Sequence, residues 1–253
     1  TLWSREMGQN MEVTTEFFDN VSQVMEKVKA NKLDMVIITG LEYLTHPDGR
    51  LLEPGMVGVA SKASPLTELL LVVHKSAKVE SLSQLRGGKF LFYAGVGGEG
   101  LGQLWLDTLL LRERLPVISQ FCKFSRVDNV SKAVLPVFFR QAAAALVPKQ
   151  SYDSMVELNP QVGRELVVFK NSPQLLATST YFRKDYKPEL KQEILDLAMR
   201  KRSAPAGRQI MTLFRVSDIV PLVEKDADSL RALIAEHKRL LKESKEIASA
   251  RTK

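Results

Sequence analysis

The chain of 253 residues is predicted to be an α/β protein with two lobes, the second inserted into the first. Three observations predict this fold class. Short apolar runs of strand length alternate with amphipathic segments of helical periodicity. The alternation starts again near residue 84, and the last 70 or so residues are mainly helical in pattern. A layout of this kind is typical of a hinged binding protein.

The first lobe is predicted from residues 1–83 and 180–253. A buried strand at 33–39 ends at Gly40, and a parallel sheet with this pattern normally has another strand before its first helix, so we expect a further strand ahead of Thr1. The other elements expected here are a helix at 1–11, a strand at 12–18, a helix at 19–32 with Asp19 as its N-cap, strands at 55–62 and 68–76, and helices at 188–202, 205–214 and 226–244.

The second lobe is predicted from residues 84–179. The expected elements are strands at 89–94, 117–124, 142–148 and 165–172, alternating with helices at 101–114, 130–139 and 151–158. Extended crossings near residues 75–90 and 174–182 would join the lobes and act as hinges. The ligand is then expected between the lobes, because open parallel sheets bind ligands at the carboxyl ends of their strands.

Composition excludes several classes of protein. The net charge of +7 comes from basic residues that are spread over the predicted helices, which indicates a solvated surface rather than a nucleic-acid site. No apolar run reaches the roughly 18 residues that a membrane span needs. Cys122 is the only cysteine and the three histidines are scattered, so we expect no disulfide framework, no metal and no cofactor. No signal segment opens the chain, so an export signal either was removed or never existed.

The most informative stretch is YAGVGGEG, residues 93–100. It holds four glycines between a predicted strand and a predicted helix. Such a turn lets backbone N–H groups and a helix N-terminus hold an anion. It also carries the carboxylate of Glu99, which either favours the helix dipole or occupies the place of the anion.

Several longer stretches resemble the phosphate, phosphite and phosphonate-binding proteins of ABC transporters. The stretches are KANKLDMVIITGLEYL, VESLSQLRGGKFLF, VDNVSKAVLPVFFRQAAAALV and YDSMVELNPQVGRELVVFKNSPQLLATSTYFRKD, and the resemblance covers nearly the whole chain. It implies a type II periplasmic-binding fold, a periplasmic or extracytoplasmic location, a small-molecule ligand, an ABC permease as partner, and no catalysis.

The chain departs from this family where the ligand is expected. In the family the glycine-rich turn reads Ser-Thr-Ser-Gly, whereas here it is Gly97, Gly98, Glu99 and Gly100. Three hydroxyl donors are replaced, and a carboxylate about 4 Å from a dianion would repel it by about 1 to 4 kcal/mol. The family's acidic residues that receive an amino group fall at Gln150 and Thr178, and a tyrosine expected near Thr67 is absent.

The candidate ligand contacts lie at strand ends, in the glycine-rich turn and at these departures. They are Thr39, Gly40, Tyr43, Thr67, Tyr93, Gly97, Gly98, Glu99, Gly100, Gln150 and Thr178. The aromatic residues Trp3, Trp105, Phe138 and Phe139 lie at helical spacing and are expected in the core, and Asp128 is expected to cap a helix.

Three functions stay open at this point. The first is a solute-binding protein for a transporter, with an altered anion motif. The second is an extracytoplasmic sensing domain, or a homologue that has lost binding, because the last helix with Leu230, Leu233, Leu240 and Leu241 is suited to continue into a signalling helix. An enzyme is disfavoured, because no nucleophile, base and orienting group occur together.

Overall fold

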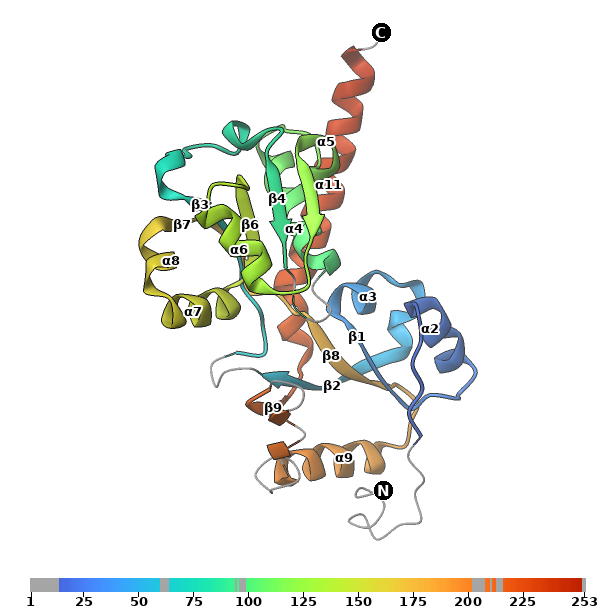
Figure 1. Cartoon of the computed structure of the whole chain (residues 1–253). Helices are drawn as coiled ribbons and strands as arrows, with labels where there is room; N and C mark the ends of the chain where they lie inside the picture. The colour runs from blue at the N-terminus through green and yellow to red at the C-terminus, as the bar shows by residue number, and fades with distance from the viewer. Residues whose placement is uncertain are drawn as a thin grey trace. The chain divides into compact units, whose positions relative to one another are not determined.

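The computed structural model describes residues 14–59, 64–93, 95, 99–201, 208–209, 211–212 and 216–251. The chain forms two compact units (Figure 1). The first contains Thr1–Ile38, Glu42–Pro65 and Ser179–Val223, and the second contains Thr39–Leu41, Leu66–Thr178 and Glu224–Lys253.

The first unit is built on a four-stranded sheet in the order β1-β8-β2-β9. Its strands are β1 (Met35–Thr39), β2 (Leu52–Val59), β8 (Thr178–Arg183) and β9 (Asp218–Pro221), with Thr39 and Thr178 counted in the second unit. Both β8 and β9 run antiparallel to β2. The helix α9 (Pro188–Lys201) packs on this sheet, where Met56, Phe182, Ile194, Leu197 and Ala198 form a buried cluster. Strand β9 was not predicted.

The remaining elements of the first unit precede β2. Helix α2 (Val21–Lys29) begins after Asn20, whose side chain accepts a hydrogen bond from the Gln23 N–H at 3.1 Å. The predicted N-cap, Asp19, is therefore wrong by one residue. Helix α3 (Gly40–Thr45) spans the boundary of the units, and the 3₁₀ turn η1 (Pro47–Leu51) follows it. Residues 14–18 form no strand, and residues 1–13 lie outside the described part.

The second unit is built on a five-stranded sheet in the order β5-β4-β6-β3-β7. Strand β4 runs parallel to β5 and β6, whereas β3 runs antiparallel to β6 and β7. The strands are β3 (Leu69–His74), β4 (Lys89–Phe92), β5 (Lys123–Arg126), β6 (Ala144–Pro148) and β7 (Leu166–Asn171). The helices and turns are η2 (Lys75–Ala77), η3 (Leu82–Leu85), α4 (Glu99–Arg112), α5 (Ile118–Phe121), α6 (Val130–Phe138), α7 (Lys149–Leu158) and α8 (Pro160–Glu165).

Helix α4 packs very closely on this sheet. A Cβ on Gly102 would lie 2.3 Å from Cζ of Phe92 and 3.2 Å from Cδ2 of Leu146, so only glycine allows this approach. Trp105 and Leu106 of the same helix are buried, as was expected for Trp105. The α6 side contributes a second cluster with Val72, Leu91 and Val134.

The last helix, α11 (Asp228–Arg251), follows η4 (Glu224–Ala227) and belongs to the second unit. It packs along α4, and its end continues past it (Figure 1). The Arg112 guanidinium donates to both carboxylate oxygens of Glu236, at 2.7 and 2.6 Å. Leu230 and Leu233 are buried.

These units differ from the predicted division in two places. Strand β3 pairs with β6 and β7, and α11 packs on α4, although both were expected in the first lobe. The expected hinge at 75–90 therefore lies inside the second unit. The chain passes between units at Ile38–Thr39, Leu41–Glu42, Pro65–Leu66, Thr178–Ser179 and Val223–Glu224. A strand belongs to the sheet that pairs its backbone, and local sequence periodicity does not specify that partner.

Several predictions about single elements and residues also differ from the structure. The predicted strand at 117–124 is a turn of helix, α5, followed by β5. Asn129 caps α6 by accepting from the Lys132 N–H at 2.9 Å, while Asp128 contacts the Lys132 ammonium instead. Phe139 is 61% exposed because α6 ends at Phe138, so the expectation that it lies in the core was wrong. Trp3 and most of the helix expected at 205–214 lie outside the described residues.

Candidate ligand-binding site

The candidate site lies where the parallel strands β4 and β6 end side by side, at the carboxyl-terminal edge of the sheet in the second unit. The two strands are parallel, and the Tyr93 N–H just after β4 donates to the Leu146 carbonyl at 2.9 Å. Helix α4 follows β4 from Glu99, and α7 starts directly after β6 at Lys149. Two helix N-termini therefore leave the same edge, which is the arrangement that favours binding of negatively charged groups.

The turn between β4 and α4 runs beside the start of α7. Gly95 has φ +69°, a left-handed conformation that favours glycine, and a Cβ placed on it would lie 3.9 Å from Cγ of Pro148. Residues 94 and 96–98 lie outside the described part, and with them Gly97 and Gly98.

The chain segments before β3 and after β7 meet the same edge. Lys149 N–H donates to the Glu68 carbonyl at 2.8 Å, and Leu69 lies opposite Pro148 in the ladder. Thr67 and Leu175 exchange two backbone hydrogen bonds of 2.8 Å each. These contacts bring Thr67 next to Lys149 and Gln150.

The start of α3 completes this edge within the second unit. The Gly40 N–H donates to the Ala177 carbonyl, and a Cβ on Gly40 would lie 2.7 Å from the Leu176 carbonyl oxygen. A Cβ on Gly100 would lie 2.9 Å from Cδ2 of Leu41. The N-terminus of α4 is therefore next to the segment 39–41.

The structure thus brings together most of the predicted site residues that it describes. Those at this edge are Thr39, Gly40, Thr67, Tyr93, Glu99, Gly100, Gln150 and Thr178. Tyr43 is different, because it lies in the first unit and its ring stacks on that of Tyr181, with centroids 4.3 Å apart. Its packing role is evident, and ligand contact by any of these residues stays a prediction.

Charged side chains beside α7 were missed by sequence reasoning. The Lys149 ammonium contacts the Asp153 carboxylate at 2.6 Å, and this hydrogen bond raises the pKa of Lys149. The Glu68 carboxylate accepts a hydrogen bond from the Asn171 amide at 2.8 Å. Lys149 directly follows the predicted strand 142–148, so the rule that ligands bind at strand ends could have found it.

The chemistry available at this edge is binding. It offers helix N-termini, backbone groups, hydroxyls and an amide, and the lysine present is already paired with a carboxylate. Within the described ranges, no three histidine, cysteine or acidic side chains are grouped so as to hold a metal ion. In the same ranges, no helix has the length and apolar character needed to cross a membrane.

Comparison with known proteins identifies the class. The family model described as "ABC transporter, phosphonate, periplasmic substrate-binding protein" matches residues 4–227, so the chain belongs to this family. The family consists of transport-binding proteins, and its members are periplasmic. No curated protein matches the chain significantly.

Solved structures with the same fold include three relatives of low identity. A binding protein component of an ABC phosphonate transporter from Pseudomonas aeruginosa is 15% identical, with a TM-score of 0.65 over 95% of this chain and 80% of that one. A Xanthomonas citri protein bound to ATP is 18% identical, with a TM-score of 0.67 over 94% and 89%. PhnD1 from Prochlorococcus marinus, in complex with methylphosphonate, is 16% identical, with a TM-score of 0.58 over 92% and 89%. The fold is that of type II periplasmic-binding proteins, as expected.

Proposed function

We propose that this chain captures a small polar or anionic solute for an ABC-type importer and presents it to a permease, in the periplasm or another extracytoplasmic space. The observation that carries the proposal is the convergence of the N-termini of α4 and α7 at one sheet edge, together with the glycine-rich turn that leads into α4. Membership of the phosphonate-binding family supports the same reading.

The ligand, we further propose, differs from phosphate or a simple phosphonate. The turn provides Gly97, Gly98 and Glu99 where the family is expected to place three hydroxyl side chains. Lys149 does not make up for the missing hydroxyl donors, because its ammonium forms an ion pair with Asp153. We expect phosphate and methylphosphonate to bind with dissociation constants of about 1 mM or weaker, near 4 kcal/mol of binding free energy.

Calorimetry on two variants tests this proposal. Replacing Gly97→Ser, Gly98→Thr and Glu99→Ser restores three donors and removes one negative charge, so methylphosphonate affinity should rise at least tenfold, since each charge-assisted hydrogen bond contributes about 1.5 to 3 kcal/mol. The control Glu113→Gln removes the same charge from an exposed position just after α4 and should not change affinity. Micromolar binding by the unmodified chain would contradict the altered motif, and an unchanged triple variant would place the anion site elsewhere.

A sensing domain is the alternative function, and α11 is the observation that favours it. Leu230 and Leu233 anchor the first half of this helix, whereas residues 242–247 are all exposed. A helix of this kind is suited to connect a binding domain to a following segment. A gene that encodes a hydrophobic span or a kinase segment after Lys253 would favour the sensor, and failure of every ligand in a broad calorimetric screen would favour a homologue without binding.

A further inference from the structure

A polar hollow of about 360 Å³ lies in the second unit, at the opposite end of the sheet's parallel strands from the candidate ligand-binding site. It is formed by the end of β3 with η2, the start of β4, and the turn between α6 and β6. We call this cavity the basic hollow. Its polar lining residues are His74, Ser76, Lys89, Arg140 and Gln141. Lys89 begins β4 and Arg140 precedes β6, so the basic hollow is at the amino ends of the parallel strands whose carboxyl ends form the candidate ligand-binding site.

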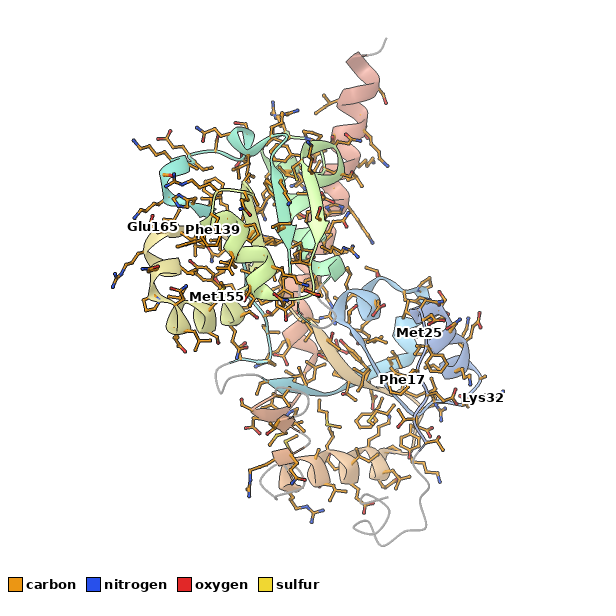
Figure 2. The ribbon with its side chains drawn as sticks, viewed as in Figure 1. Phe17, Met25, Lys32, Phe139, Met155 and Glu165 are labelled. Atoms are coloured by element: carbon orange, nitrogen blue, oxygen red, sulfur yellow. The ribbon has the colours of Figure 1, made fainter. Side chains whose placement is uncertain are left out.

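The lining of the basic hollow carries a net positive charge, which the nearby Glu165 carboxylate partly offsets through its Coulomb attraction to Arg140. Its lining contains two cations, Lys89 and Arg140, and no carboxylate. The acid beside it is Glu165, whose Oε1 accepts from the Lys75 ammonium at 2.8 Å and whose Oε2 lies 3.8 Å from Nε2 of His74. Glu165 is thus already paired with Lys75, and in the described part of the chain neither Lys89 nor Arg140 makes an ion pair. Figure 2 labels Glu165 and Phe139, the residue before Arg140.

His74 lines the basic hollow with a buried side chain that a hydrogen bond holds in place. Its side chain is 7% exposed, and its Nδ1 accepts a hydrogen bond from the Ser76 N–H at 3.1 Å. A neutral ring with Nδ1 as acceptor carries its proton on Nε2. The turn after α6 is equally well held, because Gln141 and Ala142 N–H groups both donate to the Pro136 carbonyl, at 2.7 and 3.1 Å.

A helix C-terminus carries a partial negative charge that disfavours a nearby anion, and this turn reduces that charge. The last carbonyls of α6, those of Leu135, Pro136 and Val137, all accept backbone hydrogen bonds from residues 139–142. Carbonyls that are already paired present less negative potential to a ligand. Arg140, which directly follows the helix C-cap, adds a compensating positive charge there.

A larger hollow of about 610 Å³ in the first unit provides the contrast. It is also rich in basic residues, among them Lys29 and Arg183. There, Lys29 pairs with Asp48, and Arg183 pairs with Asp34 and with Asp185 of the lining itself. Two other lining cations, Arg50 and Lys184, make no ion pair in the described part of the chain. Positive lining alone is therefore common on this chain, and a hollow whose lining lacks acids is the distinguishing feature.

We propose that the basic hollow binds a small tetrahedral oxyanion, as the free ion or as the phosphate group of a small ester. Lys89 and Arg140 supply the charge, and the Gln141 side-chain amide supplies further donors. This site is separate from the one in the proposed function and does not depend on it.

Amide NMR of the full chain, titrated with sulfate against chloride at constant ionic strength, tests the proposal. We expect saturable shifts at residues 75–77 and 140–143, with a dissociation constant of about 1 mM. The double variant Lys89→Gln, Arg140→Gln should weaken this binding at least tenfold, because two charge-assisted contacts are lost. The control Lys238→Gln, Lys245→Gln removes two exposed charges from α11 of the same unit and should keep it.

Equal weakening in both double variants would overturn the proposal, because it would indicate general attraction to a positive surface. Absence of saturable shifts at these amides would overturn it as well. Inorganic phosphate and glycerol 3-phosphate, titrated in the same way, distinguish a free ion from an ester group, and saturable binding of either supports the site. The Gly97→Ser, Gly98→Thr, Glu99→Ser variant should bind sulfate here unchanged, which separates this test from that of the proposed function.

Discussion

Gly102 shows how a single residue sets the position of α4 above the sheet. The helix begins at Glu99 in the turn that we assign to the ligand, so its distance from β4 also positions that turn. An added methyl group would meet Phe92, which is fully buried and cannot move away without disturbing the core.

We therefore expect Gly102→Ala to destabilise the protein by about 1 to 3 kcal/mol in urea unfolding, despite the better helix propensity of alanine. The matched control is Gly100→Ala in the same helix, where the new Cβ meets only the flexible end of Leu41. This control should lie between no change and a gain of about 1 kcal/mol. Equal effects of the two variants would contradict the packing argument.

Asp107 is a buried carboxyl group that accepts hydrogen bonds from the Ile118 backbone and the Gln103 side chain. It is 7% exposed, and its Oδ1 accepts from the Ile118 N–H at 2.6 Å. Burial raises the pKa of Asp107 above its usual value of 3.8. The folded state thus binds the carboxyl proton of Asp107 more tightly than the unfolded state does. Ionisation of Asp107 therefore lowers the free energy of unfolding as the pH rises from the unfolded pKa through the folded pKa of this group.

We expect Asp107→Asn to be more stable than the parent chain at pH 7, since the amide oxygen can still accept from Ile118 without the cost of a buried charge. This advantage should shrink as the pH falls toward 4, because the folded parent takes up this proton at a higher pH than the unfolded chain does. Urea unfolding at both pH values measures the difference, with Asp196→Asn at an exposed position as control. A difference that does not change with pH would contradict this account.

Cys122, the one cysteine of the chain, carries a half-buried thiol. Burial, with a smaller effect of the Asp107 charge, raises its pKa to about 12. The thiolate is the reactive form, so at pH 8 we expect Cys122 to react with a disulfide reagent at least 100-fold more slowly than a free thiol of pKa about 8.5. Unfolding in urea should restore the ordinary rate, and a fast reaction of the folded chain would contradict the burial of this thiol.

At the scale of elements, α11 has two halves with different roles. Leu233 is 4% exposed and packs in the half that lies along α4, whereas residues 242–247 are exposed. Pairs such as Arg239 with Glu243 support the second half only by contacts within the helix.

Leu233→Ala should therefore cost about 2 to 5 kcal/mol of unfolding free energy, as large-to-small core substitutions do. Removal of residues 242–253 should change it by less than about 0.5 kcal/mol, because residues 242–247 are exposed. Thermal or urea unfolding compares the two directly. A large loss on truncation would show that the second half contributes to the core.

At the scale of the whole molecule, the family membership predicts closure on ligand. Closure in binding proteins buries the ligand and uses a few residues in the crossings as hinges. We expect small-angle scattering of the triple loop variant to show a smaller radius of gyration with saturating methylphosphonate, and no change for the unmodified chain at the same concentration. Saturation shown by calorimetry without a change in radius would contradict closure.

The sequence by itself determined the class of fold and the family, and it predicted the residues of the candidate site. Short apolar runs bounded by turn residues located the strands β1, β3, β4, β6 and β7, although β1 and β7 are buried only in part. The ends of these strands, together with the glycine-rich turn, led to Gly40, Tyr93 and Gly100 before any contact was known.

Only the tertiary structure decided which sheet each strand joins and which side chains meet at a strand end. The short strand β9, the pairing of β3 with β6 and β7, and the packing of α11 on α4 depend on hydrogen bonds and contacts between residues far apart in the chain. The stacking of Tyr43 on Tyr181 depends on the same long-range placement, whereas the pairing of Lys149 with Asp153 is a local contact between positions i and i+4 of α7. Local sequence patterns report which face of an element is buried, and they carry no information about the partner that buries it.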